Sequence, residues 1–378
     1  MPPTYGPFSR SPAMIKTMQI AHYLCVRFAR GIGNSTQVDS DDWTLTETQE
    51  FNQLADVLAR AFKNKKMLSW KADDYKDWLE VNGKGARGTN AEFERRVAEE
   101  FPPLVPGVIV FETEPFILCD IKGNILMWYL PGALKNRRQL KMWKELKILQ
   151  GSFSIDEYSS SWRKNTSNYM KREDCKTLAP GTVSMAPAWF QQGHAKSNPL
   201  EVSAELRKAR GLRWIENFSD SAALIGAALS IMHTWQWQLA IQAMDNLYRD
   251  PDLVAKNETL PRVLNAWTSP LTGISVINNR LETPTHRDRG SAYEWFDILS
   301  SIGKYQNGYM RLPGAGVEVA YGPGTLVGIA GKILTHNASS VGERACIAQY
   351  MKDNVVTALV TSNHRRWANA SYIGRMEM

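Results

Sequence analysis

The sequence predicts an α+β protein in which a mainly helical N-terminal region precedes a strand-rich C-terminal region of sandwich or jelly-roll type. Apolar residues recur at helical spacing before residue 108, whereas short β-type runs separated by Gly and Pro follow residue 261. With 378 residues, 43% of them hydrophobic, the chain can bury a large core. We expect a helical region over 1–107, a mixed region over 108–260 and a β core over 261–378.

The first 107 residues contain three predicted helices. Thr46 and Gln49 have the spacing of a capping box, which predicts a helix start at Thr46. The apolar residues of this helix recur on one face: Phe51, Leu54, Leu58 and Phe62. Residues 73–81 and 90–101 read as two shorter helices, and Pro102 ends the second.

The middle region begins with short strands and ends with a long helix. Residues 116–119 and 125–129 are β-type runs joined by a turn, so they predict a hairpin, and residues 108–111 form a third run. A helix from Ser219 or Asp220 to about Tyr248 carries an apolar stripe that would support a sheet. His233 on that helix has no second ligand at i+3 or i+4, which favours a structural role.

Positive charge is concentrated in one predicted helix. The chain carries a net charge of +7, and residues 134–149 include six cations: Lys135, Arg137, Arg138, Lys141, Lys144 and Lys147. One interpretation is a surface that contacts nucleic-acid phosphates, and the other is a solvated basic helix. The segments 159–164 and 364–366 allow the same two interpretations, a polyanion contact or a polar surface.

Several protein classes are disfavoured by the sequence. The four cysteines lie far apart without a CxxC pair, which argues against a zinc ribbon and a disulfide framework. Residues 1–10 lack an apolar signal core, and the apolar segment 222–231 is far shorter than the ~20 residues of a membrane span. We therefore expect an intracellular protein without a membrane partner.

The C-terminal region is predicted to contain several short antiparallel strands. No helical pattern separates them, which argues for a sandwich or jelly roll. The predicted strands are residues 273–279, 293–299, 309–312, 317–321, 325–329, 332–334 and 345–350.

Candidate metal ligands occur only within this β region. His286 and Asp288 are two residues apart, so in a strand or its exit turn they project to the same side, and His336 follows fifty residues later. Two imidazoles and one carboxylate suit a facial-triad iron site. The alternative is that both histidines are ordinary sheet residues.

The order of the motifs adds a second component to the site. Arg344 follows His336 by eight residues at the start of a predicted strand, from which it can reach inward as a bidentate clamp for a carboxylate. In a double-stranded β-helix, His-x-Asp on an early strand and His on a late strand meet at one mouth. The order of His-x-Asp, His and Arg is the one that dioxygenases dependent on Fe(II) and 2-oxoglutarate use.

The region from Gly273 to Tyr350 resembles the catalytic core of the TET and J-binding-protein dioxygenases, including their fungal members. Residues 283–288 match the metal motif of that family, and the interval to His336 is compact. Residues 344–352 resemble the closing strand of the family, in which an aromatic residue six positions after the Arg stacks on a flipped base. Tyr350 occupies that position.

The resemblance implies an enzyme that oxidises methyl groups on DNA bases with Fe(II), 2-oxoglutarate and O2. His286, Asp288 and His336 would hold the iron and Arg344 the far carboxylate of 2-oxoglutarate. Asn278 or Asn279 would contact the cosubstrate or a neighbouring loop. Tyr350 would be the platform for an extruded base, as a methyl group inside a duplex cannot reach the iron.

Two positions depart from the animal enzymes of this family and leave the base undecided. The Asn that contacts the cytosine edge is replaced by Ser291, and the His two residues after the stacking Tyr is replaced by Lys352. Both 5-methylcytosine and N6-methyladenine are therefore candidate substrates. The expected enzyme is nuclear and monomeric. The alternatives are a dioxygenase that hydroxylates a protein or small molecule, and an inactive fold kept as a DNA-binding module.

Overall fold

The computed structural model describes residues 11–34, 43–83, 91–191, 197–250, 252, 254, 257–361 and 365–375, so the prediction for His364 lies outside it. The α-helices are α1 Pro12–Ile32, α2 Leu45–Lys63, α3 Ala72–Asn82, α4 Ala91–Glu100, α5 Asn136–Glu145, α6 Ala209–Ala227, α7 Leu229–Met232, α8 Thr234–Arg249, α9 Leu260–Ala266, α10 Asp353–Leu359 and α11 Ala370–Ile373. The strands are β1 Lys65–Met67, β2 Val110–Glu112, β3 Phe116–Cys119, β4 Asn124–Leu130, β5 Gly181–Met185, β6 Gly273–Asn278, β7 Glu282–His286, β8 Asp297–Leu312, β9 Val317–Ala320, β10 Leu326–Ile329, β11 His336–Tyr350 and β12 Ala368–Asn369.

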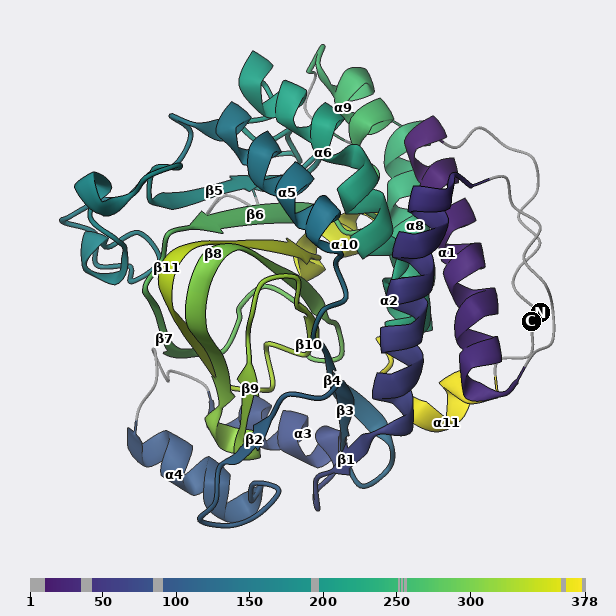
Figure 1. The fold of residues 1–378 in the computed structure, drawn as a ribbon, viewed down its shortest axis with the longest axis vertical. Coiled ribbons are helices and arrows are strands. Elements are labelled where there is room, and N and C mark those ends of the chain that lie inside the picture. Colours follow the sequence, from purple (N-terminus) through teal and green to yellow (C-terminus); the bar gives the residue numbers. More distant parts are fainter. Residues whose placement is uncertain are drawn as a thin grey trace.

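A strongly curved sheet forms one side of the molecule, and most helices pack against its outer surface (Figure 1). The main strand order is β1-β3-β4-β10-β8-β11-β6-β5, while β7 pairs with β11, β9 pairs with β8 and β2 pairs with β9. Strands and helices are thus both abundant and largely segregated. The α+β class is confirmed, with the jelly-roll core expected for the C-terminal region.

Two long strands, β8 and β11, pair along most of their length and connect the two layers of the jelly roll. The first part of β8 pairs with β10, and its last part pairs with β9. Likewise, the start of β11 pairs with β7 and its end pairs with β6. Each strand therefore leaves one layer and enters the other.

Glycines allow the two long strands to approach closely where they bend. Gly303 and Gly342 have φ values of 135° and 117°. A Cβ on Gly303 would lie 2.3 Å from the Glu343 carbonyl oxygen, and one on Gly342 would lie 2.7 Å from the Lys304 carbonyl oxygen. No other residue type fits such positions without strain, because the left-handed backbone and the close contact both exclude a side chain.

The outer face of the sheet forms the main hydrophobic core with the helices. Ile298, Ala345 and Ile347 are fully buried in a cluster that also contains Trp214 and Phe218 of α6. Since side chains alternate along a strand, Arg344, Cys346 and Tyr350 face the opposite, inner side. This alternation decides which residues can reach a site between the two layers.

The start of α2 and the long predicted helix differ from expectation. The capping box is made by Thr44 and Glu47, so α2 begins at Leu45 and not at Thr46. A carboxylate at this position also suits the positive end of the helix dipole. The second prediction was wrong in extent, because α6 already begins at Ala209 and the helix is interrupted between α7 and α8 at His233.

His233 has the structural role that the sequence favoured. Its Nδ1 accepts a hydrogen bond from the Gln236 backbone N–H and caps α8, while its Nε2–H donates to the Glu294 carbonyl oxygen. Burial lowers the pKa of His233 to about 4, so the ring is neutral, and both of its nitrogens are hydrogen-bonded.

Most predicted strands of the β region were right in place, but some were wrong in length and one was not a strand. Residues 293–299 and 309–312 were expected as two strands, yet β8 runs without interruption from Asp297 to Leu312. Residues 332–334 form a turn and not a strand. The full length of β8 could not be predicted from the sequence, because β8 and β11 bend while keeping their hydrogen bonds.

The basic helix α5 uses some of its cations in contacts within the molecule. Arg138 is buried and pairs with Glu50, while Lys141 pairs with Glu145. These contacts favour the structural interpretation for Arg138 and Lys141 over direct contact with phosphates. All four cysteines are free thiols, and no described helix is long and apolar enough to cross a membrane.

Candidate metal and cosubstrate site

The two predicted histidines and Asp288 meet at one point where β7 ends and β11 begins. His286 and His336 are directly paired residues of these strands. The Nε2 atoms of His286 and His336 lie 3.4 Å and 3.5 Å from the two oxygens of Asp288. One ligand atom from each residue lies within 4.8 Å of the others, so these three residues could hold a metal ion.

Both imidazoles are oriented by their second nitrogen. The Nδ1–H of His286 donates to the Pro284 carbonyl oxygen at 2.8 Å, and that of His336 donates to the Leu334 carbonyl oxygen at 3.0 Å. A carbonyl can only accept, so Nδ1 carries the proton and Nε2 presents its lone pair to the site. Such contacts are typical of histidines that bind metals.

Asp288 is fixed by its backbone and by the charges around it. Its N–H donates to the Gly331 carbonyl oxygen at 2.8 Å. Burial alone would raise the pKa of Asp288, but the neighbouring imidazoles of His286 and His336, in their protonated form, and the guanidinium of Arg163 outweigh it and lower that pKa to about 2. The carboxylate is therefore ionised and able to bind a cation.

The space beside this carboxylate depends on a glycine. A Cβ on Gly331 would lie 2.6 Å from Asp288 Oδ2. The absence of a side chain at Gly331 therefore leaves room for the Asp288 carboxylate. The neighbouring glycine, Gly328, faces Met232 of the helical core.

We predict that Gly331→Ala lowers iron affinity by roughly 10–100-fold, the range typical of disturbing the surroundings of a metal ligand. The added methyl group displaces the Asp288 carboxylate while leaving the backbone allowed. Binding of Fe(II) under anaerobic conditions, measured by calorimetry, tests this. Gly322→Ala is the matched control because a Cβ there meets nothing within 4 Å. Equal iron affinity in both variants would contradict the prediction.

Arg344 is a buried cation without a carboxylate partner. It is 5% exposed, and its Nε donates to Ser301 Oγ at 2.8 Å. Its guanidinium lies 4.5 Å from the ring centre of Tyr321, and within the described residues it makes no ion pair. Burial lowers the pKa of Arg344, but Tyr321, Cys346 and Tyr305 raise it further, so the group stays charged.

The buried guanidinium of Arg344 fits an anionic ligand. An unpaired charge in the interior costs several kcal/mol. A carboxylate from a bound molecule would remove that cost and could accept two parallel hydrogen bonds. The residues around Arg344 therefore suit the distal carboxylate of a dicarboxylic acid.

The two asparagines at the end of β6 lie on different sides of the strand. Asn278 is paired with Ala345, so it shares the helix-side face of the sheet, and its Nδ2 donates to the Ala179 carbonyl oxygen. This placement argues for the neighbouring loop, and not a cosubstrate, as its partner. Asn279 instead accepts from the Arg344 backbone N–H at 3.2 Å.

The predicted base-contacting residues occupy three different environments. The Tyr350 ring lies against Gly273, where a Cβ would come within 2.7 Å of it, and its hydroxyl bonds Ser275. Ser291 is buried, and its hydroxyl has no partner within the described residues. Lys352 lies 5.2 Å from the Trp189 ring centre.

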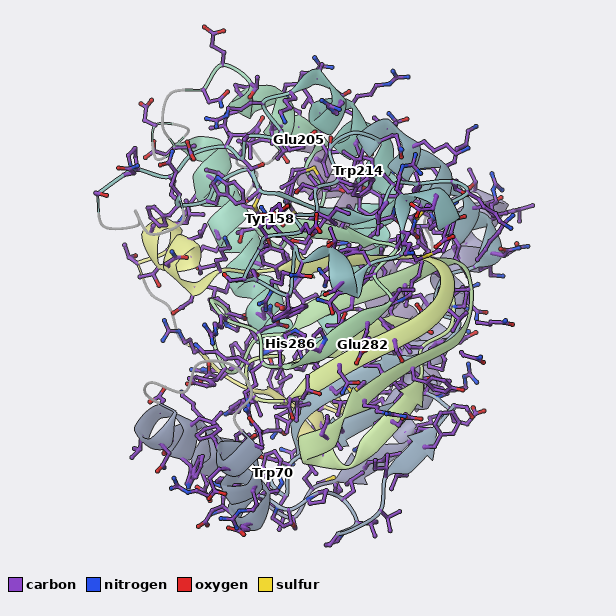
Figure 2. All side chains as sticks on the ribbon, turned by 90° about the vertical axis from the view of Figure 1, so that its left-hand side faces the viewer. Trp70, Tyr158, Glu205, Trp214, Glu282 and His286 are labelled. Atoms are coloured by element: carbon purple, nitrogen blue, oxygen red, sulfur yellow. The ribbon has the colours of Figure 1, made fainter. Side chains whose placement is uncertain are left out.

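Sequence reasoning missed the side chains that cover the metal ligands. The ring of Trp162 lies 4.6 Å from that of His286, and Arg163 Nη2 lies 3.7 Å from Asp288 Oδ1. Figure 2 shows His286 and, above it, Tyr158, which precedes Trp162 by four residues. The sequence indicated a functional surface through the mixture of Trp, Arg and Lys in residues 159–164. It did not show that these residues lie at the metal site.

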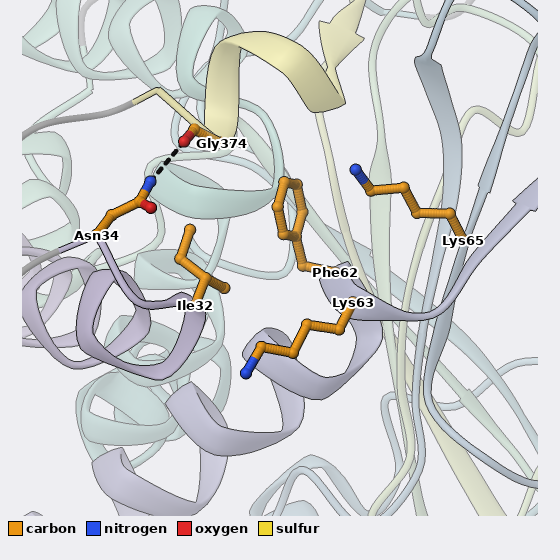
Figure 3. Close-up of a pocket in the computed structure, with 6 residues that line it drawn as sticks. All are labelled: Ile32, Asn34, Phe62, Lys63, Lys65 and Gly374. Carbon is orange, nitrogen blue, oxygen red and sulfur yellow. Dashed lines mark hydrogen bonds between the residues drawn. The ribbon is translucent and has the colours of Figure 1, made fainter.

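A separate pocket lies between α1, α2 and α11 (Figure 3). Its volume is about 410 Å³, and it shares no residue with the metal cluster. Its lining contains two lysines but no His, Cys, Asp or Glu: Ile32, Asn34, Phe62, Lys63, Lys65 and Gly374. The pocket therefore lacks the groups needed for the metal chemistry described above.

Comparison with known families accounts for this geometry. Residues 186–353 match the Tet/JBP family, described as the oxygenase domain of the 2OGFeDO superfamily. These residues are a TET/JBP oxygenase domain. The chain is therefore a dioxygenase that depends on Fe(II) and 2-oxoglutarate, as the resemblance implied. A closer relation to the fungal members stays a prediction.

The TET/JBP domain extends further toward the N-terminus than expected. The resemblance was seen from Gly273 onward, whereas the match begins at residue 186 and includes the helices α6 to α9. Those helices form the core on the outer face of the sheet, and residues 108–260 were expected to contribute such buttressing helices. The proposed boundaries at 107 and 260 stay predictions.

The chain is similar to several solved structures. One is NgTET1 in complex with 5mC DNA, which is 12% identical, with a TM-score of 0.48, and the match covers 82% of this chain and 92% of NgTET1. Among curated proteins, none matches the chain.

Proposed function

We propose that the TET/JBP domain oxidises the methyl group of a modified DNA base, with 5-methylcytosine as the leading substrate. The observation that carries this proposal is the position of Tyr350. Tyr350 lies on the strand of Arg344 and on the same inner face. An aromatic ring on the face of the sheet that also carries the cosubstrate clamp suits a flat base that stacks on it.

The residues around the metal cluster would have different roles in catalysis. His286, Asp288 and His336 would hold Fe(II), and Arg344 would bind the distal carboxylate of 2-oxoglutarate. Together with O2 these groups supply the oxidising power that places one oxygen atom on the methyl group and converts 2-oxoglutarate to succinate and CO2. Trp162 would limit access of water, because it covers His286.

A base must leave the duplex to reach Tyr350, which costs a few kcal/mol. Contacts to phosphates would offset this cost, and cations close to the site can provide them. Arg163 is 45% exposed beside Asp288, and Lys332 and Lys352 follow Gly331 and Tyr350 along the chain. We therefore propose these residues, and not the buried Arg138 of α5, as the phosphate contacts.

The identity of the base is the open part of the proposal. Ser291 and Lys352 stand where animal relatives carry Asn and His, so N6-methyladenine is the second candidate. A nuclear, monomeric enzyme fits a DNA substrate. The competing function is hydroxylation of a protein or small molecule, for which the site would need no aromatic platform.

Succinate formation tests the proposal directly. We expect turnover with Fe(II), 2-oxoglutarate and duplexes that carry 5-methylcytosine, above the level seen with matched unmodified DNA. Mass spectrometry of 5-methylcytosine and N6-methyladenine duplexes then identifies the oxidised base. An active enzyme that leaves both methylated duplexes unchanged would refute the DNA function and favour a protein or small-molecule substrate.

A further inference from the structure

We infer that the carboxyl group of Asp297 hydrogen-bonds the polar edge of the flipped base and is a substrate-binding residue of this enzyme. The inference rests on the proposed DNA function and deepens it. It concerns a residue that belongs neither to the metal ligands nor to the clamp for 2-oxoglutarate. The evidence is the position of Asp297, its lack of partners and its chemistry.

The sheet register places Asp297 beside the proposed base platform. Ile298 pairs with Gln349, so one more step along the same register brings Asp297 opposite Tyr350. Opposite residues of antiparallel strands point to the same face, at about 4.5–5.5 Å between their Cβ atoms. On its other side Asp297 pairs with Ile329, which ends β10 just before Gly331.

Alternation along β8 directs Asp297 to the inner face. Ile298 is fully buried in the helix-side core, so its neighbour Asp297 faces the other way, together with Ser301 of the same strand. Ser301 is the residue that binds Arg344. Asp297 therefore lies on the wall that carries the cosubstrate clamp.

One carboxyl oxygen of Asp297 has no hydrogen-bond partner among the residues that the structure describes. Its Oδ1 is buried without a hydrogen bond, and within the described residues the side chain forms no ion pair. The residue as a whole stays partly accessible although strands flank it on both sides. An unsatisfied buried acceptor costs about 1–3 kcal/mol, so a purely structural role would favour an apolar residue here.

The chemistry of this carboxyl group suits a nucleobase. Burial raises the pKa of Asp297 well above its usual range, and the charge of Asp288 adds to this effect. A protonated carboxyl group offers one donor and one acceptor side by side. The polar edge of a base also presents a donor next to an acceptor, for example the amino group and ring nitrogen of cytosine, so two hydrogen bonds can form in one plane.

Two substitutions test the inference. Asp297→Leu removes both hydrogen bonds at similar volume, whereas Asp297→Asn keeps one donor and one acceptor without titrating. We expect Asp297→Leu to lower kcat/KM for duplexes with 5-methylcytosine or N6-methyladenine by at least ~10-fold, since one unmade hydrogen bond costs about 1–3 kcal/mol. Asp297→Asn should stay within about threefold of the wild type.

Succinate formation without DNA distinguishes a base-binding role of Asp297 from a merely structural one. It depends on the iron and cosubstrate sites alone, and we expect both variants to keep it. Undiminished DNA turnover in Asp297→Leu would overturn the inference, as would a parallel loss of DNA-independent succinate. Loss of DNA turnover in Asp297→Asn would overturn the two-bond pairing. If the wild type oxidises no methylated duplex, the proposed function itself fails, which is a distinguishable result.

Discussion

His286→Ala is expected to abolish turnover and to weaken iron binding by more than ~100-fold, beyond the loss typical of removing an outer partner of a metal ligand. Two ligands remain in this variant, and a facial triad needs three. Anaerobic titration with Fe(II) and succinate formation measure the two effects. DNA binding should stay within a few-fold, because phosphate contacts do not pass through this imidazole.

His22→Ala is the matched control for this experiment. His22 lies exposed on α1 and makes no contact with the metal cluster. We expect it to keep both iron and turnover. A His286→Ala variant that retains normal iron content and activity would show that these residues do not form the metal centre, and a collapse of DNA binding would show that His286 is structural.

Arg344→Met is expected to lower the affinity for 2-oxoglutarate by roughly 10–150-fold, which corresponds to the ~1.5–3 kcal/mol of a hydrogen bond to a charged group. The side chain keeps much of its volume but loses the cation. The protein without cosubstrate should be at least as stable as the wild type, because a buried unpaired charge is removed. Thermal unfolding with and without 2-oxoglutarate measures both quantities.

Arg311→Met on the same strand β8 as Ser301 provides the comparison. Arg311 is exposed and pairs with Glu318 at the surface, so its loss should leave the response to 2-oxoglutarate unchanged. If Arg344→Met retains the full stabilisation by 2-oxoglutarate, then Arg344 does not bind the cosubstrate. A marked loss of stability in the absence of cosubstrate would instead indicate that the cation supports the fold.

Much of the candidate site could be predicted because its parts are local in sequence or ordered along the chain. The spacing of His286 and Asp288 fixes their common direction, and the order of His336 and Arg344 matches two points on one strand. Asn278 shows the limit of this reasoning. A shift of one residue turns a side chain to the opposite face, so Asn279 approaches the Arg344 backbone while Asn278 faces the helices.

Other parts of the site depend on contacts between distant segments. Trp162 and Arg163 reach the metal ligands across more than a hundred residues, and Asp297 becomes significant only once the register sets it opposite Tyr350. The composition of such segments reveals polar or aromatic character but not the partner.

By itself, the sequence determined the α+β class, the metal-binding motif, the position of Arg344 and the family, because periodicity and motif spacing are properties of neighbouring residues. Only the tertiary structure decided which side chains meet. It joined β8 and β11 into bent strands and used the cations of α5 internally. Within the described residues, it also left Arg344 without an anionic partner and Asp297 Oδ1 without a hydrogen bond. Such pairings arise from strand register and long-range packing, which no local pattern encodes.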